Sequence, residues 1–179
     1  KHVARETQRL LRSAPFAGFP ATLKSAYETV AGKLAPEPQG RAELDTEFGV
    51  VASAVAEFPL AKTAPFFDLP EGKEKGAGGL LSVTVNPEAC KGCNICVDVC
   101  PEDALVTVRQ DEAEVERLRR NWDFWKRLPD TDERYVNVRS IDEGIGVLSS
   151  LLLKKKVYRS MVGGDGAWMG CGGETAVHL

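Results

Sequence analysis

The chain has 179 residues, of which 43% are hydrophobic and 27% charged, and its formal net charge is −3 at pH 7. This composition fits one or two small globular domains, and the absence of a basic excess argues against a nucleic-acid partner. No apolar run approaches the ~20 residues that span a bilayer, so we expect no membrane partner. Because the chain starts with Lys1 and stops at Leu179 directly after a glycine-rich stretch, we expect a piece of a longer polypeptide.

The first third of the chain is predicted to be helical. Proline and glycine punctuation separates a helix that ends before Pro15, a second over 22–34 and a third over 42–58. Apolar residues at helical spacing in the third are Leu44, Phe48, Val51, Val55 and Phe58. Such a stripe is typical of core packing, and no metal ligands gather here. We therefore interpret residues 1–58 as a helical insert, and residues 59–80 as a linker.

The linker leads into a second predicted region, which begins at residue 81. Phe66 and Phe67 are expected to anchor the linker against a neighbouring surface. Alternating residues then predict strands over 81–85 and 104–108, on either side of a short helix over 95–100. This order is one half of a ferredoxin-type β-α-β repeat, so the predicted fold class is α+β, with a ferredoxin-like cluster-binding region over 81–110.

Four of the five cysteines lie within twelve residues, at Cys90, Cys93, Cys96 and Cys100, and Pro101 follows. The spacing C-x2-C-x2-C-x3-C-P is typical of [4Fe–4S] ferredoxins, because thiolates at these intervals wrap an iron–sulfur cube. Gly92 lets the backbone turn tightly between the first two ligands. The four cysteines are the predicted ligands, and a cluster of this kind indicates a reducing, cytoplasmic compartment.

The cysteine spacing argues against disulfides and against a zinc site. Disulfides between cysteines so close together would close short strained loops, and zinc sites favour two separated C-x2-C pairs.

The spacing leaves open which residue is the fourth ligand of the cube. In two-cluster ferredoxins the last cysteine of the run ligates the other cube, so either Cys100 closes the same cube or its cluster is completed by polypeptide outside this chain. We favour the second alternative.

A helical connection is predicted over residues 111–160. A charged amphipathic helix over 112–127 carries an apolar face made by Val115, Leu118, Trp122 and Trp125. A short strand is expected over 135–138. Ser140 and Glu143 then form a capping box that opens a helix to about Leu153. The glycine-rich residues 161–179 are interpreted as the start of a further domain.

The cysteine run, the helix that ends at Leu128-Pro129 and the tail Gly164-Asp-Gly-Ala-Trp-Met-Gly-Cys-Gly-Gly-Glu174 together resemble the pyruvate:ferredoxin (2-oxoacid:ferredoxin) oxidoreductases. The resemblance covers roughly residues 78–179. It implies a ferredoxin-like domain that runs into the start of a thiamine diphosphate domain. Residues 1–77 resemble an insert between the two cluster motifs of a longer variant.

The resemblance implies an electron-relay segment of a CoA-dependent enzyme that decarboxylates a 2-oxoacid such as pyruvate. Thiamine diphosphate, magnesium and coenzyme A would belong to the intact enzyme and not to this segment, which would hold no catalytic residue. The implied partners are the rest of the oxidoreductase or its other subunits and ferredoxin or flavodoxin, in a homo-oligomer. Cys171 is a further candidate metal ligand, although Trp168 stands where the family has another cysteine. The alternatives are a free-standing one-cluster electron-transfer subunit and a structural zinc module.

Overall fold

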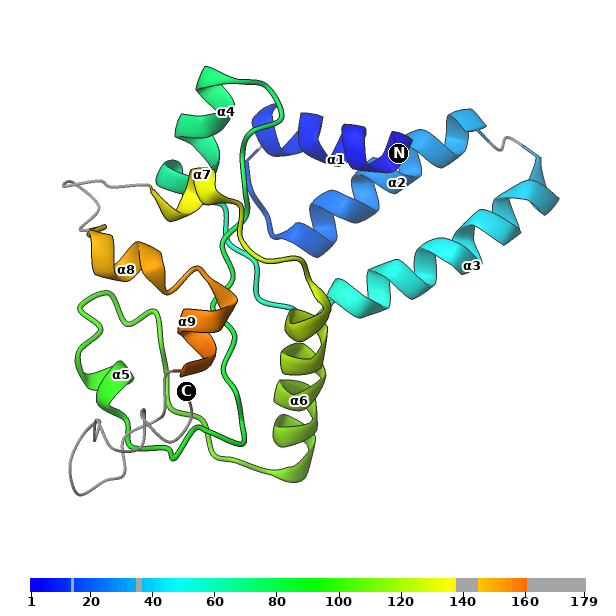
Figure 1. The fold of residues 1–179 in the computed structure, drawn as a ribbon. Helices are drawn as coiled ribbons and strands as arrows, with labels where there is room; N and C mark the ends of the chain where they lie inside the picture. Colours follow the sequence, from blue (N-terminus) through cyan, green and yellow to red (C-terminus); the bar gives the residue numbers. More distant parts are fainter. Residues whose placement is uncertain (14, 35–36, 138–144, 161–179) are drawn as a thin grey trace. The chain divides into compact units, whose positions relative to one another are not determined.

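The chain divides into two compact units, which comprise residues 1–83 and 84–179, and most of the described residues lie in helices (Figure 1). The computed structural model describes residues 1–13, 15–34, 37–137 and 145–160. Among these residues no helix is long and apolar enough to cross a membrane.

The first unit begins with α1 (His2–Ser13), α2 (Phe19–Leu34) and α3 (Pro38–Val55). α2 packs against both of the other helices. Leu11 of α1 and Ala26 of α2 are buried where the first two helices meet, as amphipathic patterning requires. The three predicted helices are therefore confirmed, with boundaries that differ by a few residues.

The helix boundaries differ because proline is tolerated in the first turn of a helix, where its missing N–H leaves no bond unmade. Pro20 lies in the first turn of α2, which begins at Phe19 and not at residue 22, and α3 begins at Pro38 and not at residue 42. The stripe predicted for the third helix is only partly buried. Phe58 is 4% exposed, but Val51 is 53% exposed, so its assignment to the core was wrong.

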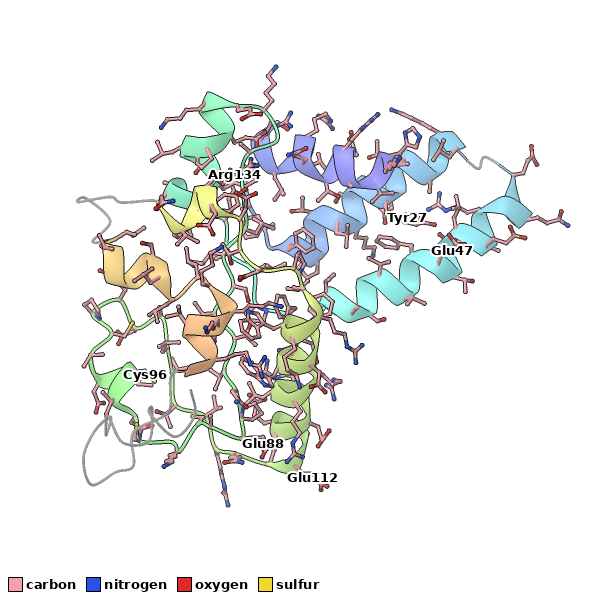
Figure 2. All side chains as sticks on the ribbon, viewed as in Figure 1. Tyr27, Glu47, Glu88, Cys96, Glu112 and Arg134 are labelled. Atoms are coloured by element: carbon pink, nitrogen blue, oxygen red, sulfur yellow. The ribbon has the colours of Figure 1, made fainter. Side chains whose placement is uncertain are left out.

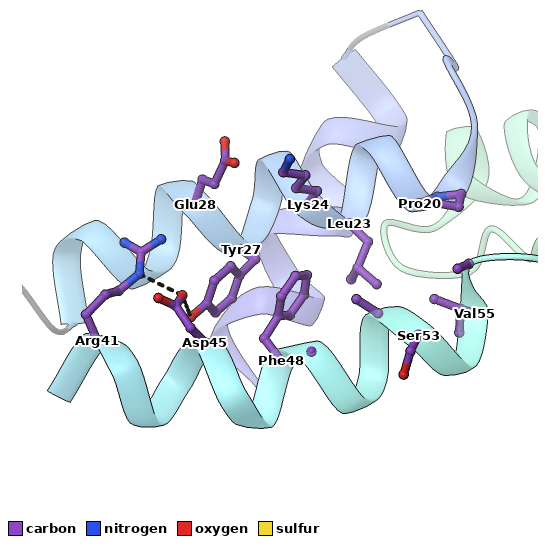
Figure 3. Close-up of a pocket in the computed structure, with 13 residues that line it drawn as sticks. Pro20, Leu23, Lys24, Tyr27, Glu28, Arg41, Asp45, Phe48, Ser53 and Val55 are labelled. Carbon is purple, nitrogen blue, oxygen red and sulfur yellow. Dashed lines mark hydrogen bonds and ion pairs between the residues drawn. The ribbon is translucent and has the colours of Figure 1, made fainter. Parts of the chain in front are cut away.

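A groove of about 560 Å³ runs between α2 and α3 (Figure 3). Phe48 stacks on the Tyr27 ring with the two centroids 3.8 Å apart. The Tyr27 hydroxyl donates to Asp45 at 2.6 Å, and Arg41 donates to the same carboxylate oxygen at 3.0 Å. α3 is therefore held to α2 by one stacked ring pair and a small polar network.

The linker is more structured than its proline and glycine content predicts. A π-helical turn, η1 (Ala64–Asp68), continues into α4 (Leu69–Lys73). Phe66 and Phe67 are 8% and 2% exposed, as expected for anchoring side chains. Their burial supplies apolar stabilisation that local turn propensity does not reveal.

The two strands predicted around the cysteine run are not formed. Leu81 makes only an isolated antiparallel bridge with Ala61, and residues 104–108 contain no strand. Val83 and Val106 are 57% and 71% exposed, so no apolar layer covers these segments. A strand needs a hydrogen-bonded neighbour and a buried face. The described residues are therefore mostly helical without a sheet, which corrects the predicted α+β class.

The second unit contains α5 (Ile95–Asp98), α6 (Glu112–Arg127), α7 (Glu133–Val136), α8 (Val147–Leu151) and α9 (Lys155–Ser160). α6 has the predicted bounds because Asp111 caps it: its side chain accepts from the N–H of Glu114 at 2.8 Å. A strand was predicted over 135–138, but residues 135 and 136 belong to α7, and residue 138 lies outside the described residues. Asp132 accepts from the N–H of Arg134 at 3.0 Å, which favours a helical start over an extended chain.

The aromatic face predicted on α6 is a packing face. Trp122 and Trp125 stack with their ring centroids 4.6 Å apart, and Tyr158 of α9 lies 5.5 Å from Trp125. The Tyr158 hydroxyl donates to the carbonyl of Thr84 at 2.7 Å. These contacts join α6, α9 and the chain that enters the cysteine run. The predicted capping box at 140–143 lies outside the described residues.

Candidate iron–sulfur cluster site

A turn at Asn86 delivers the first cysteine of the run. The Asn86 carbonyl accepts from the N–H of Cys90 at 2.9 Å, and its side-chain oxygen accepts from the N–H of Glu88 at 3.1 Å. Glu88 also pairs with Arg119 of α6, with 2.8 Å between Nε and the carboxylate oxygen. Local hydrogen bonds therefore shape the entry to the site, and a surface ion pair connects it to α6.

Two residues with positive φ turn the chain between the cysteines. Gly92 has φ 62°, as expected for the glycine between the first two ligands, and Asn94 has φ 62° and ψ −2°. Glycine and asparagine are the residues that tolerate this left-handed conformation best. The Asn94 carbonyl accepts from the N–H groups of Val97 and Asp98, both at 2.9 Å, which starts α5.

The last cysteine of the run is surrounded by backbone donors. The Cys100 N–H donates to the carbonyl of Val97 at 3.1 Å, and its sulfur accepts from the N–H of Ala104 at 3.3 Å. Asp103, with φ 49°, forms the turn between them. Hydrogen bonds from the backbone of Ala104 and then Glu102 lower the pKa of the Cys100 thiol, because they stabilise its anionic form. The thiolate is the form that binds iron.

All four clustered cysteines carry free thiols near the surface, and Figure 2 shows Cys96 on α5. Cys90 and Cys96 are exposed, while Cys93 and Cys100 are partly exposed. Across the described ranges, no three His, Cys, Asp or Glu side chains converge into a metal-holding group. The cysteines fit a [4Fe–4S] cluster by the chemistry and spacing of their donors and by the sharp turns between them.

The remaining predicted ligand cannot be placed in the same way. Cys171 and Trp168 fall in residues 161–179, which lie outside the described residues. The prediction that Cys171 is a further metal ligand therefore stays a prediction. The same holds for the interpretation of the glycine-rich stretch as the start of another domain.

The sequence patterns did not predict one side-chain contact at the site. The Thr107 hydroxyl donates to Oδ1 of Asn94 at 3.1 Å, across thirteen residues. An asparagine directly after Cys93 does signal a left-handed turn. Nothing in the spacing identifies Thr107 as its partner, because the pairing depends on the path of the chain after Cys100.

The sequence of this region identifies the class of the site. Residues 83–106 match a family described as a 4Fe-4S binding domain, and this match contains all four clustered cysteines. The chain is distantly homologous to the pyruvate-flavodoxin oxidoreductases over much of its length. No solved structure matches the chain.

Three relatives show the extent of this similarity. The chain is 28% identical over 149 residues to the pyruvate-flavodoxin oxidoreductase of Trichormus variabilis, which covers 78% of this chain and 12% of the relative. The enzyme of the same name from a Nostoc species is 29% identical over 67% of the chain and 10% of its own length. The pyruvate-flavodoxin oxidoreductase of Rhodospirillum rubrum is 31% identical over 45% of this chain and 7% of its own length.

These coverages bear on the organisation of the chain. The chain spans about a tenth of the length of the relatives it matches. The alignment with the Trichormus enzyme covers more of the chain than residues 78–179 alone could supply, so it extends into the helical region 1–77. The similarity is therefore wider than the resemblance carried by the cysteine run and the tail.

Proposed function

We propose that this chain is an electron-relay segment of a CoA-dependent 2-oxoacid (pyruvate-type):ferredoxin oxidoreductase. The observation that carries the proposal is the C-x2-C-x2-C-x3-C-P run from Cys90 to Pro101. It lies inside the 4Fe-4S family match, on a chain homologous to pyruvate-flavodoxin oxidoreductases. A bound [4Fe–4S] cluster would supply reversible one-electron transfer.

Each part of the run has a defined task in this proposal. Cys90, Cys93 and Cys96 hold one cube, and Cys100 ligates a neighbouring one. The Asn86 turn and the Glu88 pair with Arg119 position the first ligand. The N–H of Ala104 donates to the Cys100 sulfur, and such donors stabilise the more negative, reduced state of a cluster. The chain itself breaks no substrate bond.

Iron and acid-labile sulfide analysis of anaerobically prepared chain tests the cluster directly. We expect equal amounts of iron and sulfide and a brown absorption that bleaches on reduction. A colourless protein that binds zinc with thiolate ligands and contains no sulfide would establish the structural zinc module instead.

Serine substitutions test the task of Cys100. Replacing Cys90 should abolish the cube, because serine is a poor ligand for iron in such clusters. In the native polypeptide, where other residues supply the fourth ligand, Cys100→Ser should leave the cube held by Cys90, Cys93 and Cys96 in place if Cys100 ligates a neighbouring cluster. Equal loss of iron and sulfide in both variants would show that Cys100 closes the same cube.

The remaining tasks belong to the intact enzyme. We propose that thiamine diphosphate, magnesium and coenzyme A act on polypeptide outside this segment, and that ferredoxin or flavodoxin accepts the electrons. A native polypeptide much heavier than the 19.4 kDa of this chain would support the relay. A native polypeptide of 19.4 kDa that exchanges electrons with ferredoxin would instead support a free-standing one-cluster subunit.

A further inference from the structure

A hydrogen bond closes the cysteine run into a loop. The Thr107 hydroxyl donates to Oδ1 of Asn94 at 3.1 Å, and the chain between them carries Cys96 and Cys100. We propose that this contact, the Asn94–Thr107 latch, is a positioning device that restrains the loop carrying Cys96 and Cys100 and thereby slows the loss of a bound cluster. That a cluster binds here rests on the proposed function. The hydrogen bond itself is seen in the structure.

The first half of the latch is coupled to the helix that carries a ligand. The left-handed backbone of Asn94 aims its carbonyl at the N–H groups of Val97 and Asp98, which start α5. Cys96 lies on this four-residue helix. A helix this short has little stability of its own. A tether on the Asn94 side chain therefore restrains the residue that fixes where the helix starts.

The second half of the latch restrains the chain that returns from Cys100. Residues 104–108 form no strand, so no ladder of backbone hydrogen bonds fixes this segment. The N–H of Ala104 donates to the Cys100 sulfur, three residues before the threonine. The Thr107 hydroxyl therefore fixes the outgoing side of Cys100 to the start of α5.

The identity of residue 94 fits both requirements of the latch. Glycine would adopt φ 62° without strain but has no side-chain acceptor. Aspartate would keep an acceptor but would add negative charge beside thiolates that are themselves anionic. Asparagine tolerates the left-handed conformation and presents a neutral acceptor. If asparagine served the turn alone, glycine would replace it without loss.

The first experiment compares two substitutions of the threonine in the full chain. Thr107→Val removes the hydroxyl at nearly constant volume, whereas Thr107→Ser keeps it. The measured quantity is the rate at which an iron chelator bleaches the anaerobic, cluster-loaded protein. We expect loss about three- to tenfold faster in Thr107→Val, the range expected for one hydrogen bond, and a rate close to that of the unmodified chain in Thr107→Ser.

The partner residue completes a double-mutant cycle. Asn94→Gly should accelerate cluster loss as Thr107→Val does, and the double variant should be no faster than either single one, because all three lack the same bond. The electron paramagnetic resonance spectrum of the reduced cluster should change in these three variants and not in Thr107→Ser. Rates within about twofold of the unmodified chain in Thr107→Val, or additive effects in the double variant, would overturn the latch.

A second measurement separates the latch from the cluster itself. Amide hydrogen exchange at Val97 and Asp98 in metal-free chain should be faster in Thr107→Val than in Thr107→Ser, because the start of α5 loses its tether. Equal exchange would overturn the latch whether or not a cluster binds. Absence of iron and sulfide from the native polypeptide that contains this segment would overturn the proposed function, while the exchange result would still decide the latch.

Discussion

Glu71 holds the loop that leads from α4 towards the cysteine run, and its removal should destabilise the first unit. Its side chain is 6% exposed. It accepts from the N–H of Gly76 at 2.9 Å and of Gly78 at 2.8 Å, and it pairs with Arg12 of α1. One buried carboxylate therefore joins a helix near the start of the chain to a loop about sixty residues later.

The loss expected for Glu71→Ala follows from these three contacts. Hydrogen bonds to a charged group contribute about 1.5–3 kcal/mol each when buried. The Arg12 side chain is 33% exposed and Gly76 lies at the surface, so water would replace part of what is lost. We therefore expect a decrease of about 2–4 kcal/mol in the free energy of unfolding, and about half of that for Glu71→Gln, which keeps one acceptor.

Urea unfolding followed by far-ultraviolet circular dichroism measures this decrease. All three tryptophans lie after residue 83, so tryptophan fluorescence reports on the second unit during the same titration. Glu74→Ala is the matched control, because Glu74 is an exposed carboxylate in the same turn and should change stability by less than about 0.5 kcal/mol. Equal midpoints for Glu71→Ala and the control would refute the reasoning.

The same carboxylate makes stability depend on pH. Burial raises the pKa of Glu71, but the N–H groups of Gly76 and Gly78 and the Arg12 guanidinium together hold it below its ordinary value. A carboxyl with a lowered pKa in the folded state stabilises fully above its unfolded pKa of about 4.3 and loses this contribution as the pH falls through the folded value. Acid unfolding of Glu71→Gln should therefore lack this component.

Three further substitutions test packing, a helix cap and the aromatic face. Gly78→Ala should destabilise by about 1–3 kcal/mol in urea, because its Cβ would lie 2.9 Å from the Phe67 ring, whereas Gly72→Ala, with nothing within 4 Å, should not. Asp111→Ala should lower the stability of α6 by about 1 kcal/mol through loss of its N-cap, and Asp111→Asn should restore most of it. Tyr158→Phe should lower the free energy of unfolding measured by tryptophan fluorescence by about 0.5–1.5 kcal/mol, because the Thr84 carbonyl loses this hydroxyl donor; an unchanged midpoint would contradict each expectation.

The sequence predicted those features whose causes are local. The α6 bounds follow from the apolar spacing along residues 112–127 and from the stop at Leu128-Pro129. The cysteine spacing predicted the kind of site for the same reason, because metal ligands within one loop must be close in sequence. Contacts between distant residues, such as Thr107 with Asn94 and Arg12 with Glu71, were not predictable, since they depend on how the chain returns.

The failed strand prediction bears on how the cluster site is completed. The alternating residues over 81–85 and 104–108 favour strands, but the structure forms none there. Val83, Val106 and Val108 are 57%, 71% and 57% exposed. Such side chains form a sheet only when a second layer or a neighbouring strand covers them. In a two-cluster ferredoxin the counterpart half-repeat would provide that partner and would share Cys100 with its own cube. The exposure of these valines therefore supports the proposal that other polypeptide completes this half of the site. It agrees with the role proposed for Cys100 as a ligand of a neighbouring cube.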